Sequence, residues 1–143
     1  MVGFSYGGYV ALTSSFQKPN QFKCIVSVAG ISDINQVAAN LSKYKNYRPF
    51  INKTMGNIND EETVEQLATL SAINKIKTPI LLIHGKHDTR VKFSQSANFY
   101  NKAKQAGLEA DYIEFERGTH FLVENENRLE AFRAMGEFLN TYL

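Results

Sequence analysis

The segment GFSYGGY at residues 3–9 constrains the fold more than any other part of the sequence. It contains Gly3, Ser5 and Gly7 in the spacing Gly-x-Ser-x-Gly, which is typical of a tight turn between a β-strand and an α-helix. In such a turn the serine backbone is strained, and the two glycines are expected to leave room for it. The amide of Tyr6 and the N-terminal end of the helix would face an oxyanion formed at the serine. The sequence therefore predicts an exposed, nucleophilic Ser5 with the Tyr6 amide as an oxyanion donor.

Short apolar runs alternate with amphipathic segments along the rest of the chain, which is typical of an α/β protein with a parallel sheet. The run PILLIH at residues 79–84 is almost entirely apolar, as expected for a strand that is buried on both faces. Other predicted elements are strands at residues 23–28 and 111–115 and helices at residues 7–16, 34–41, 61–70 and 93–106. In a final helix the spacing predicts a buried stripe of Leu129, Phe132, Met135 and Leu139. We expect about three parallel strands flanked by helices.

The length and composition of the chain fit one soluble globular domain. It has 143 residues, of which 43% are apolar and 21% are charged. No apolar run reaches the roughly 18 residues of a membrane span. The formal net charge is +2 and both signs are interspersed, which argues against nucleic acid or an anionic membrane as a partner. Cys24, the only cysteine, lies in an apolar run, so we expect a buried thiol and no internal disulfide. The compartment stays open between cytoplasmic, periplasmic and secreted.

A serine hydroxyl is a weak nucleophile at neutral pH, so Ser5 needs an imidazole to take its proton and a carboxylate to orient that imidazole. In α/β-hydrolases these groups follow in the order serine, acid, histidine, each after a strand. His120 fits the base because it comes in a turn after the predicted strand at residues 111–115. Asp88 fits the acid because it follows the most apolar strand, whereas Asp111 falls inside a strand and Asp60 at a polar helix start. We therefore predict Ser5, Asp88 and His120 as the catalytic residues of a hydrolase.

Two further histidines lie close to Asp88 in the sequence and allow a different interpretation. His84, His87 and Asp88 supply nitrogen and oxygen donors that would suit zinc. No second cluster supplies the remaining ligands, so we expect no metal site, and nothing in the sequence indicates a cofactor. His84 is instead expected to hold the loop by a hydrogen bond, and His87 is expected to face solvent.

Four strings together resemble the catalytic domain of the prolyl oligopeptidase family: GFSYGGY, SVAGISD, PILLIHGKHDTRVKFSQS and GTHFLVENENR. The resemblance covers nearly the whole chain and places Ser5, Asp88 and His120 at the family's catalytic positions. It implies a serine peptidase that cleaves short peptides through an acyl-enzyme, removing dipeptides or acylated residues or cutting after proline. It also implies that Ile31 and Val37 line the pocket for the residue before the cleaved bond.

The chain begins at most two residues before the predicted turn at Ser5. By the resemblance, we expect residues 1–143 to be a partial α/β-hydrolase domain, its C-terminal part, with the N-terminal strands, the second oxyanion donor and a β-propeller domain missing. Backbone groups along one edge of the strand at residues 23–28 would then be unpaired, so this edge is expected to associate with a second copy or another chain. Two other functions stay open: an esterase on the same scaffold and a truncated, non-catalytic interaction module.

Overall fold

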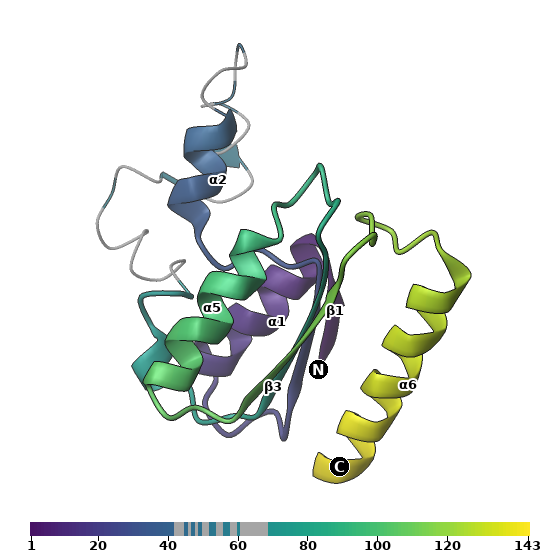
Figure 1. Ribbon diagram of the computed structural model, residues 1–143. Coiled ribbons are helices and arrows are strands. Elements are labelled where there is room, and N and C mark those ends of the chain that lie inside the picture. Colours follow the sequence, from purple (N-terminus) through teal and green to yellow (C-terminus); the bar gives the residue numbers. More distant parts are fainter. Residues whose placement is uncertain are drawn as a thin grey trace.

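Figure 1 shows the computed structural model of the chain, which describes residues 1–41, 45, 47, 49, 52–53, 56–57, 60 and 69–143. The described elements, in chain order, are β1 (Val2–Phe4), α1 (Tyr6–Gln17), β2 (Ile25–Val28), α2 (Ile34–Leu41), the 3-10 helix η1 (Ile73–Lys75), β3 (Ile80–Gly85), α5 (Ser94–Gln105), β4 (Ala110–Phe115) and α6 (Asn125–Tyr142). Strands and helices alternate, which confirms the predicted α/β class. The helix predicted at residues 61–70 lies almost entirely outside the described residues.

The strands form one parallel, four-stranded sheet in the order β1-β2-β3-β4. Strands β2, β3 and β4 correspond to the three predicted strands, whereas the sequence analysis missed β1. This short segment extends the sheet because the Met1 carbonyl accepts a hydrogen bond from the Val26 amide, and the Ser5 amide donates to the Val28 carbonyl, both at 2.8 Å. The described sheet therefore has β1 and not β2 at this edge, which corrects the open edge predicted at residues 23–28.

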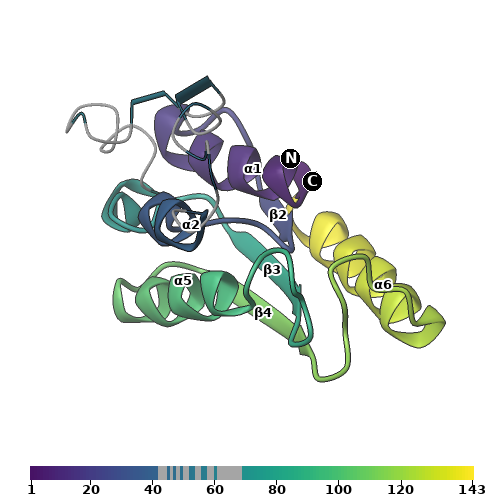
Figure 2. The same cartoon turned by 90° about the horizontal axis from the view of Figure 1, so that it is seen from above.

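Helices cover both faces of the sheet, with α1 and α5 on one side and α6 on the other (Figure 2). Alternate residues of β3 point to opposite faces, as in any strand. Ile80 and Leu82 pack in one core cluster with residues of α1 and α5, while Leu81 and Ile83 pack in a second cluster with residues of α6. Residues 80–83 are all apolar because both faces of β3 are covered.

The apolar face of α6 is turned relative to the predicted one. Ala131 and Phe138 are buried against the sheet, and Met135 and Leu139 are half-buried beside them. Leu129 and Phe132 are 52% and 64% exposed, so the predicted buried stripe is wrong at these two positions. Each residue of a helix advances by about 100° around its axis, so a face centred on positions 131, 135 and 138 leaves position 132 on its flank, about 90° away, and position 129 about 150° away, near the opposite side of the helix.

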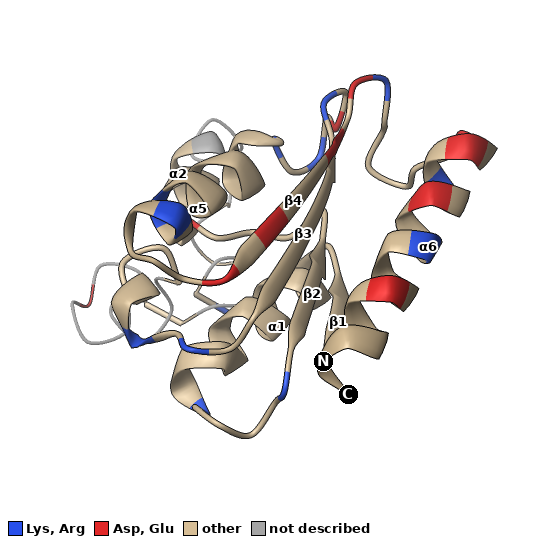
Figure 3. Cartoon of the chain, turned by 60° about the horizontal axis from the view of Figure 1, so that its bottom comes forward, with Lys and Arg blue, Asp and Glu red and all other residues tan. Residues whose placement is uncertain are grey.

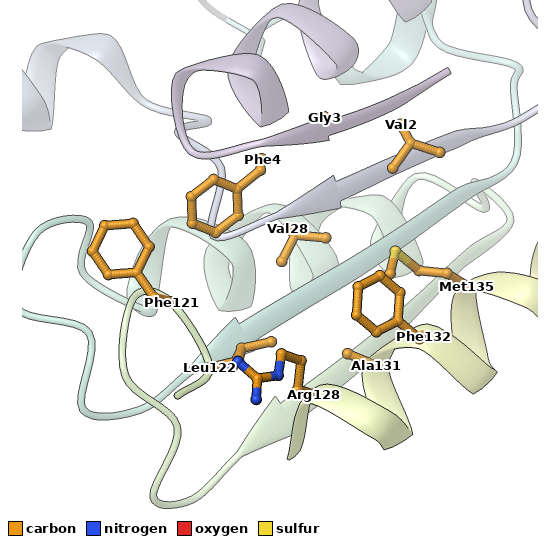
Figure 4. Close-up of a pocket in the computed structure, with 10 residues that line it drawn as sticks. All are labelled: Val2, Gly3, Phe4, Val28, Phe121, Leu122, Arg128, Ala131, Phe132 and Met135. Carbon is orange, nitrogen blue, oxygen red and sulfur yellow. The ribbon is translucent and has the colours of Figure 1, made fainter. Parts of the chain in front are cut away.

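Phe132 borders an open apolar groove between α6 and the edge of the sheet (Figure 4). The groove has a volume of about 370 Å³, and Val2 and Phe4 of β1 line its other side. Figure 4 shows Phe132 and Met135 pointing from α6 toward the strands. Val2 and Phe4 are 50% and 42% exposed, so the uncovered apolar surface of the described chain runs along β1 and the flank of α6.

Charged residues of both signs are spread over α6 and the loops that join the elements, and acidic residues also lie on β4 (Figure 3). Cys24 is a buried free thiol, as predicted. No helix among the described residues is long and apolar enough to cross a membrane.

Candidate active site

Ser5 occupies the turn between β1 and α1 in a strained backbone conformation. Its φ of 55° and ψ of −119° lie in a region that residues other than glycine adopt rarely, at a cost of about 1–3 kcal/mol. Space is tight at Gly3, where a Cβ would lie 1.9 Å from the carbonyl oxygen of Gly7. A Cβ at Gly7 would meet no atom within 4 Å. The expectation that both glycines make room for the turn therefore holds for Gly3 and fails for Gly7.

Asp88 lies in the loop after β3 and is only 6% exposed. Its Oδ1 accepts hydrogen bonds from the backbone amides of Arg90 and Val91, both at 2.8 Å. Its Oδ2 lies 2.6 Å from Nδ1 of His120 and 3.2 Å from Nε2 of His84. Burial by itself raises the pKa of the Asp88 carboxyl, but the hydrogen bonds from two histidines and two amides outweigh burial and lower the pKa to about 2. Asp88 is therefore an anion at neutral pH.

Two glycines bring the loops that carry Asp88 and His120 into backbone contact. Gly85 ends β3 and Gly118 follows β4, and a Cβ at Gly85 would lie 2.2 Å from the Gly118 carbonyl oxygen. The same carbonyl accepts a hydrogen bond from the His87 amide at 2.9 Å. A side chain at Gly85 would push the two loops apart, so this glycine sets the distance between the acid and the histidine.

Ser5, His120 and Asp88 form one line of hydrogen bonds at the carboxyl ends of parallel strands. Ser5 Oγ lies 3.0 Å from His120 Nε2, and His120 Nδ1 lies 2.6 Å from Asp88 Oδ2. Because an ionised carboxylate can only accept, His120 Nδ1 carries the proton, and Nε2 is left to accept from the serine hydroxyl. The three side chains follow β1, β3 and β4, whose ends meet at one edge of the sheet. This arrangement can take the proton of the Ser5 hydroxyl as its oxygen attacks an electrophile.

Aromatic rings pack around the His120 imidazole, which is only 6% exposed. The ring centroids of Phe4 and Phe121 each lie 5.1 Å from that of the imidazole, and the two phenyl rings stack on each other. The guanidinium of Arg90 lies 4.9 Å from the Phe121 centroid, a cation–π contact that joins the Asp88 loop to the His120 loop. Neither ring was predicted from the sequence to contact the imidazole, although each phenylalanine is adjacent in sequence to a predicted catalytic residue.

The two other histidines have different surroundings. His84 is fully buried, and its Nε2 lies 2.9 Å from the Val91 carbonyl oxygen of the Asp88 loop, so it holds this loop as predicted. His87 is exposed, as predicted. Within the ranges that the structure describes, no group of three His, Cys, Asp or Glu side chains is arranged to hold a metal ion.

Gln95, near the start of α5, is a buried polar residue that the sequence analysis also missed. Its side-chain oxygen accepts hydrogen bonds from the amides of Ser32 and Asp33 at 2.8 and 2.7 Å, and its side-chain nitrogen donates to Gln36 at 2.8 Å. These bonds tie α5, which follows the Asp88 loop, to the segment between β2 and α2. In the sequence, Gln95 lies in the string PILLIHGKHDTRVKFSQS that carries the family resemblance, but the helix pattern gives it no role, and only the structure shows that it is 2% exposed.

The family model described as "Prolyl oligopeptidase family" matches residues 1–143, which is the whole chain. The chain belongs to the prolyl oligopeptidase family. This confirms the resemblance on which the sequence analysis drew.

Curated relatives include the dipeptidyl aminopeptidase BIII of Pseudoxanthomonas mexicana, 27% identical over 96% of the chain, and the acylamino-acid-releasing enzyme of Mus musculus, 26% identical over all of it. The chain spans about a fifth of the length of these relatives, 20% in each case. The solved structure of uncomplexed acylaminoacyl peptidase from Pyrococcus horikoshii matches with a TM-score of 0.82 and 27% identity, covering 99% of the chain and 23% of that structure. A puromycin-hydrolyzing peptidase from Mycobacterium tuberculosis has the same fold, with a TM-score of 0.86 at 23% identity over 99% of the chain and 21% of its own.

The remaining site residues predicted for this member of the prolyl oligopeptidase family lie near the turn. Tyr6 begins α1 directly after Ser5. Ile31 is buried in a small apolar cluster with Tyr9, and Val37 packs half-buried against that cluster. The oxyanion role of Tyr6 and the pocket role of Ile31 and Val37 stay predictions.

Proposed function

We propose that this chain carries the catalytic residues of a serine peptidase, with Ser5 as the nucleophile, His120 as the general base and Asp88 as the acid that orients it. The observation that carries the proposal is the line of hydrogen bonds from Ser5 through His120 to Asp88, at 3.0 and 2.6 Å, beginning at a strained turn. Membership of the prolyl oligopeptidase family and the peptidase names of its relatives support peptides as the substrate class.

In the proposed mechanism, Ser5 Oγ attacks the carbonyl carbon of a peptide bond while His120 Nε2 takes the hydroxyl proton. The Tyr6 amide would donate to the oxyanion of the tetrahedral intermediate, aided by the N-terminal end of α1. His120 then gives the proton to the leaving amine, and the C–N bond breaks to leave an acyl-enzyme. Water, activated by the same imidazole, hydrolyses the ester and restores Ser5. Asp88 stays ionised throughout and stabilises the imidazolium.

For the substrate, we propose short peptides from whose N-terminus a dipeptide or an acylated residue is removed, as the names of two relatives suggest. The residue before the cleaved bond would contact Ile31 and Val37. Both side chains are apolar and belong to one packed cluster beside the Asp88 loop, to which Val91 also contributes. An apolar pocket at this place would favour an apolar side chain in the substrate.

A fluorophosphonate probe tests the nucleophile directly, because it bonds covalently to a serine that a neighbouring base activates. We expect labelling of the protein, loss of labelling in Ser5→Ala, and unchanged labelling in Ser14→Ala. Ser14 is a matched control because its hydroxyl donates to the Val10 carbonyl within α1, away from His120. A folded protein that stays unlabelled would instead favour a non-catalytic interaction module.

Parallel assays with an acylated or N-terminally free dipeptide amide and with a short-chain ester separate peptidase from esterase. Both substrates pass through the same acyl-enzyme, so turnover of the ester alone would show that the amide bond is not the natural target. We expect both to be cleaved, with a dependence on the side chain before the cleaved bond for the peptide.

A further inference from the structure

His84 is a fully buried imidazole that the proposed mechanism does not use. It lies near the end of β3, four positions before Asp88. Its Nδ1 lies 2.7 Å from Ser96 Oγ, and its Nε2 lies 2.9 Å from the Val91 carbonyl oxygen and 3.2 Å from Asp88 Oδ2. Both ring nitrogens are therefore engaged, one with α5 and the other with the Asp88 loop.

The partners of His84 determine where its proton sits. A carbonyl oxygen can only accept, so the bond to Val91 requires that Nε2 carries the hydrogen. Nδ1 then accepts from the Ser96 hydroxyl in the neutral imidazole. The Nε2–H group points at two acceptors, the Val91 carbonyl and the Asp88 carboxylate. The Val91 carbonyl thus holds His84 in the form that carries a hydrogen on Nε2, and the Ser96 hydroxyl, itself only 2% exposed, satisfies Nδ1.

This contact completes the surroundings of the Asp88 carboxylate. Oδ1 accepts hydrogen bonds from two backbone amides. The other oxygen, Oδ2, is therefore available to accept from His120. On Oδ2 the His84 distance of 3.2 Å is longer than the His120 distance of 2.6 Å. His84 therefore restricts rotation of the carboxylate without displacing His120 from it.

We propose that His84 is a positioning residue for the reaction: it holds Asp88 Oδ2 in line with His120 Nδ1, the Val91 carbonyl fixes the hydrogen on His84 Nε2 that allows this, and Ser96 holds the other side of the ring. The role rests on the proposed function, because it acts through Asp88 and His120. An apolar side chain at position 84 would leave the Val91 carbonyl, the Ser96 hydroxyl and one side of Oδ2 without this partner.

Kinetics of His84→Leu and His84→Gln test the role, because glutamine can keep a donor near the position of Nε2 and leucine cannot. We expect His84→Leu to lower kcat about 10- to 100-fold with KM unchanged, by analogy with the loss of a hydrogen-bond partner that orients a metal-binding side chain. His84→Gln should recover most of the loss. Ser96→Ala should lower kcat less than His84→Leu does, and Ser94→Ala, a serine two residues earlier that contacts Gln36 instead, should leave it unchanged.

A double-mutant cycle separates positioning from a general structural effect. If His84 acts through Asp88, His84→Leu should have less than about a twofold effect on the rate of fluorophosphonate labelling when Asp88 is already asparagine. An equal loss in both backgrounds, or no loss in His84→Leu alone, would overturn the proposal.

Nitrogen-15 NMR of the histidine side chains provides a measurement that does not depend on activity. We expect His84 to carry a hydrogen on Nε2, and we expect the His120 Nδ1–H proton to be protected from exchange in the wild type and in His84→Gln but not in His84→Leu. A His84 with no hydrogen on Nε2 would contradict the proposal. Absence of fluorophosphonate labelling in the unsubstituted protein would refute the proposed function but not the arrangement of His84 and Asp88. The NMR measurement would still test that arrangement.

Discussion

Replacing Asp88 by asparagine should make the chain less stable at neutral pH, by an amount that disappears in acid. Asp88 lies 6% exposed under two backbone amides and two imidazoles, which together lower the pKa of its carboxyl from 3.8 to about 2. An amide at position 88 keeps the shape of the side chain but carries no charge for these donors to stabilise. The amide also replaces one acceptor oxygen by an NH2 donor, so only the part of the difference that varies with pH reports the charge.

The size of the effect follows from the pKa values of the folded and unfolded states. One pKa unit corresponds to about 1.4 kcal/mol, so a pKa of about 2 instead of 3.8 contributes about 2 kcal/mol to the free energy of unfolding. Since the folded-state pKa is the lower one, the unfolded chain binds more protons between these values, and stability rises with pH. The contribution is complete above the unfolded pKa of 3.8 and is lost as the pH falls toward about 2.

Urea unfolding followed by circular dichroism at a series of pH values from about 7 to about 2.5 measures this contribution. The difference in unfolding free energy between the wild type and Asp88→Asn should shrink by about 2 kcal/mol over this range. Asp111→Asn, which removes an exposed carboxylate on β4, is the matched control and should change the free energy of unfolding by less than about 0.5 kcal/mol at any pH. If the difference in unfolding free energy between the wild type and Asp88→Asn stays constant with pH, the reasoning is refuted. The hydrogen bonds would then not favour the ionised form of the Asp88 carboxyl.

Three further predictions follow from the packing. Phe99→Ala should lower the free energy of unfolding by about 3–5 kcal/mol in urea titrations, because this ring is fully buried between α5 and the sheet; a loss below 1 kcal/mol would contradict the described core. Gly85→Ala should sharply slow fluorophosphonate labelling of Ser5 while the far-ultraviolet circular dichroism is kept, because its Cβ would lie 2.2 Å from the Gly118 carbonyl oxygen; unchanged labelling would show that the loop contact does not set the site. The purified chain should self-associate through the uncovered apolar surface of β1 and α6, and Phe132→Glu should reduce this, since Phe132 is 64% exposed; a monodisperse monomer in light scattering would argue against it.

The strands could be predicted where a segment is covered on both faces. Residues 80–83 are apolar at every position, and no other arrangement of so short a run suits them as well as a central parallel strand. Strand β1 could not be predicted in the same way, because Val2–Phe4 is too short for a periodic pattern. Its assignment depends on the ladder that it forms with β2.

The orientation of α6 shows a different limit. Apolar residues occur at seven of the positions from 129 to 139, namely Leu129, Ala131, Phe132, Ala134, Met135, Phe138 and Leu139. They cover so much of the helix circumference that the periodicity allows more than one buried face. The contact with β2 and β3 selects the face that contains Ala131 and Phe138.

The sequence by itself determined which three residues make up the candidate site, because Ser5, Asp88 and His120 each occur in a local string whose spacing has a physical meaning: a tight turn, the end of a buried strand and a turn after the next strand. Only the tertiary structure decided what surrounds them. The His84 and Ser96 contacts, the rings of Phe4 and Phe121 and the approach of Gly85 to Gly118 depend on distances between segments far apart in the chain, and such distances result from the packing of the sheet and its helices rather than from any local pattern.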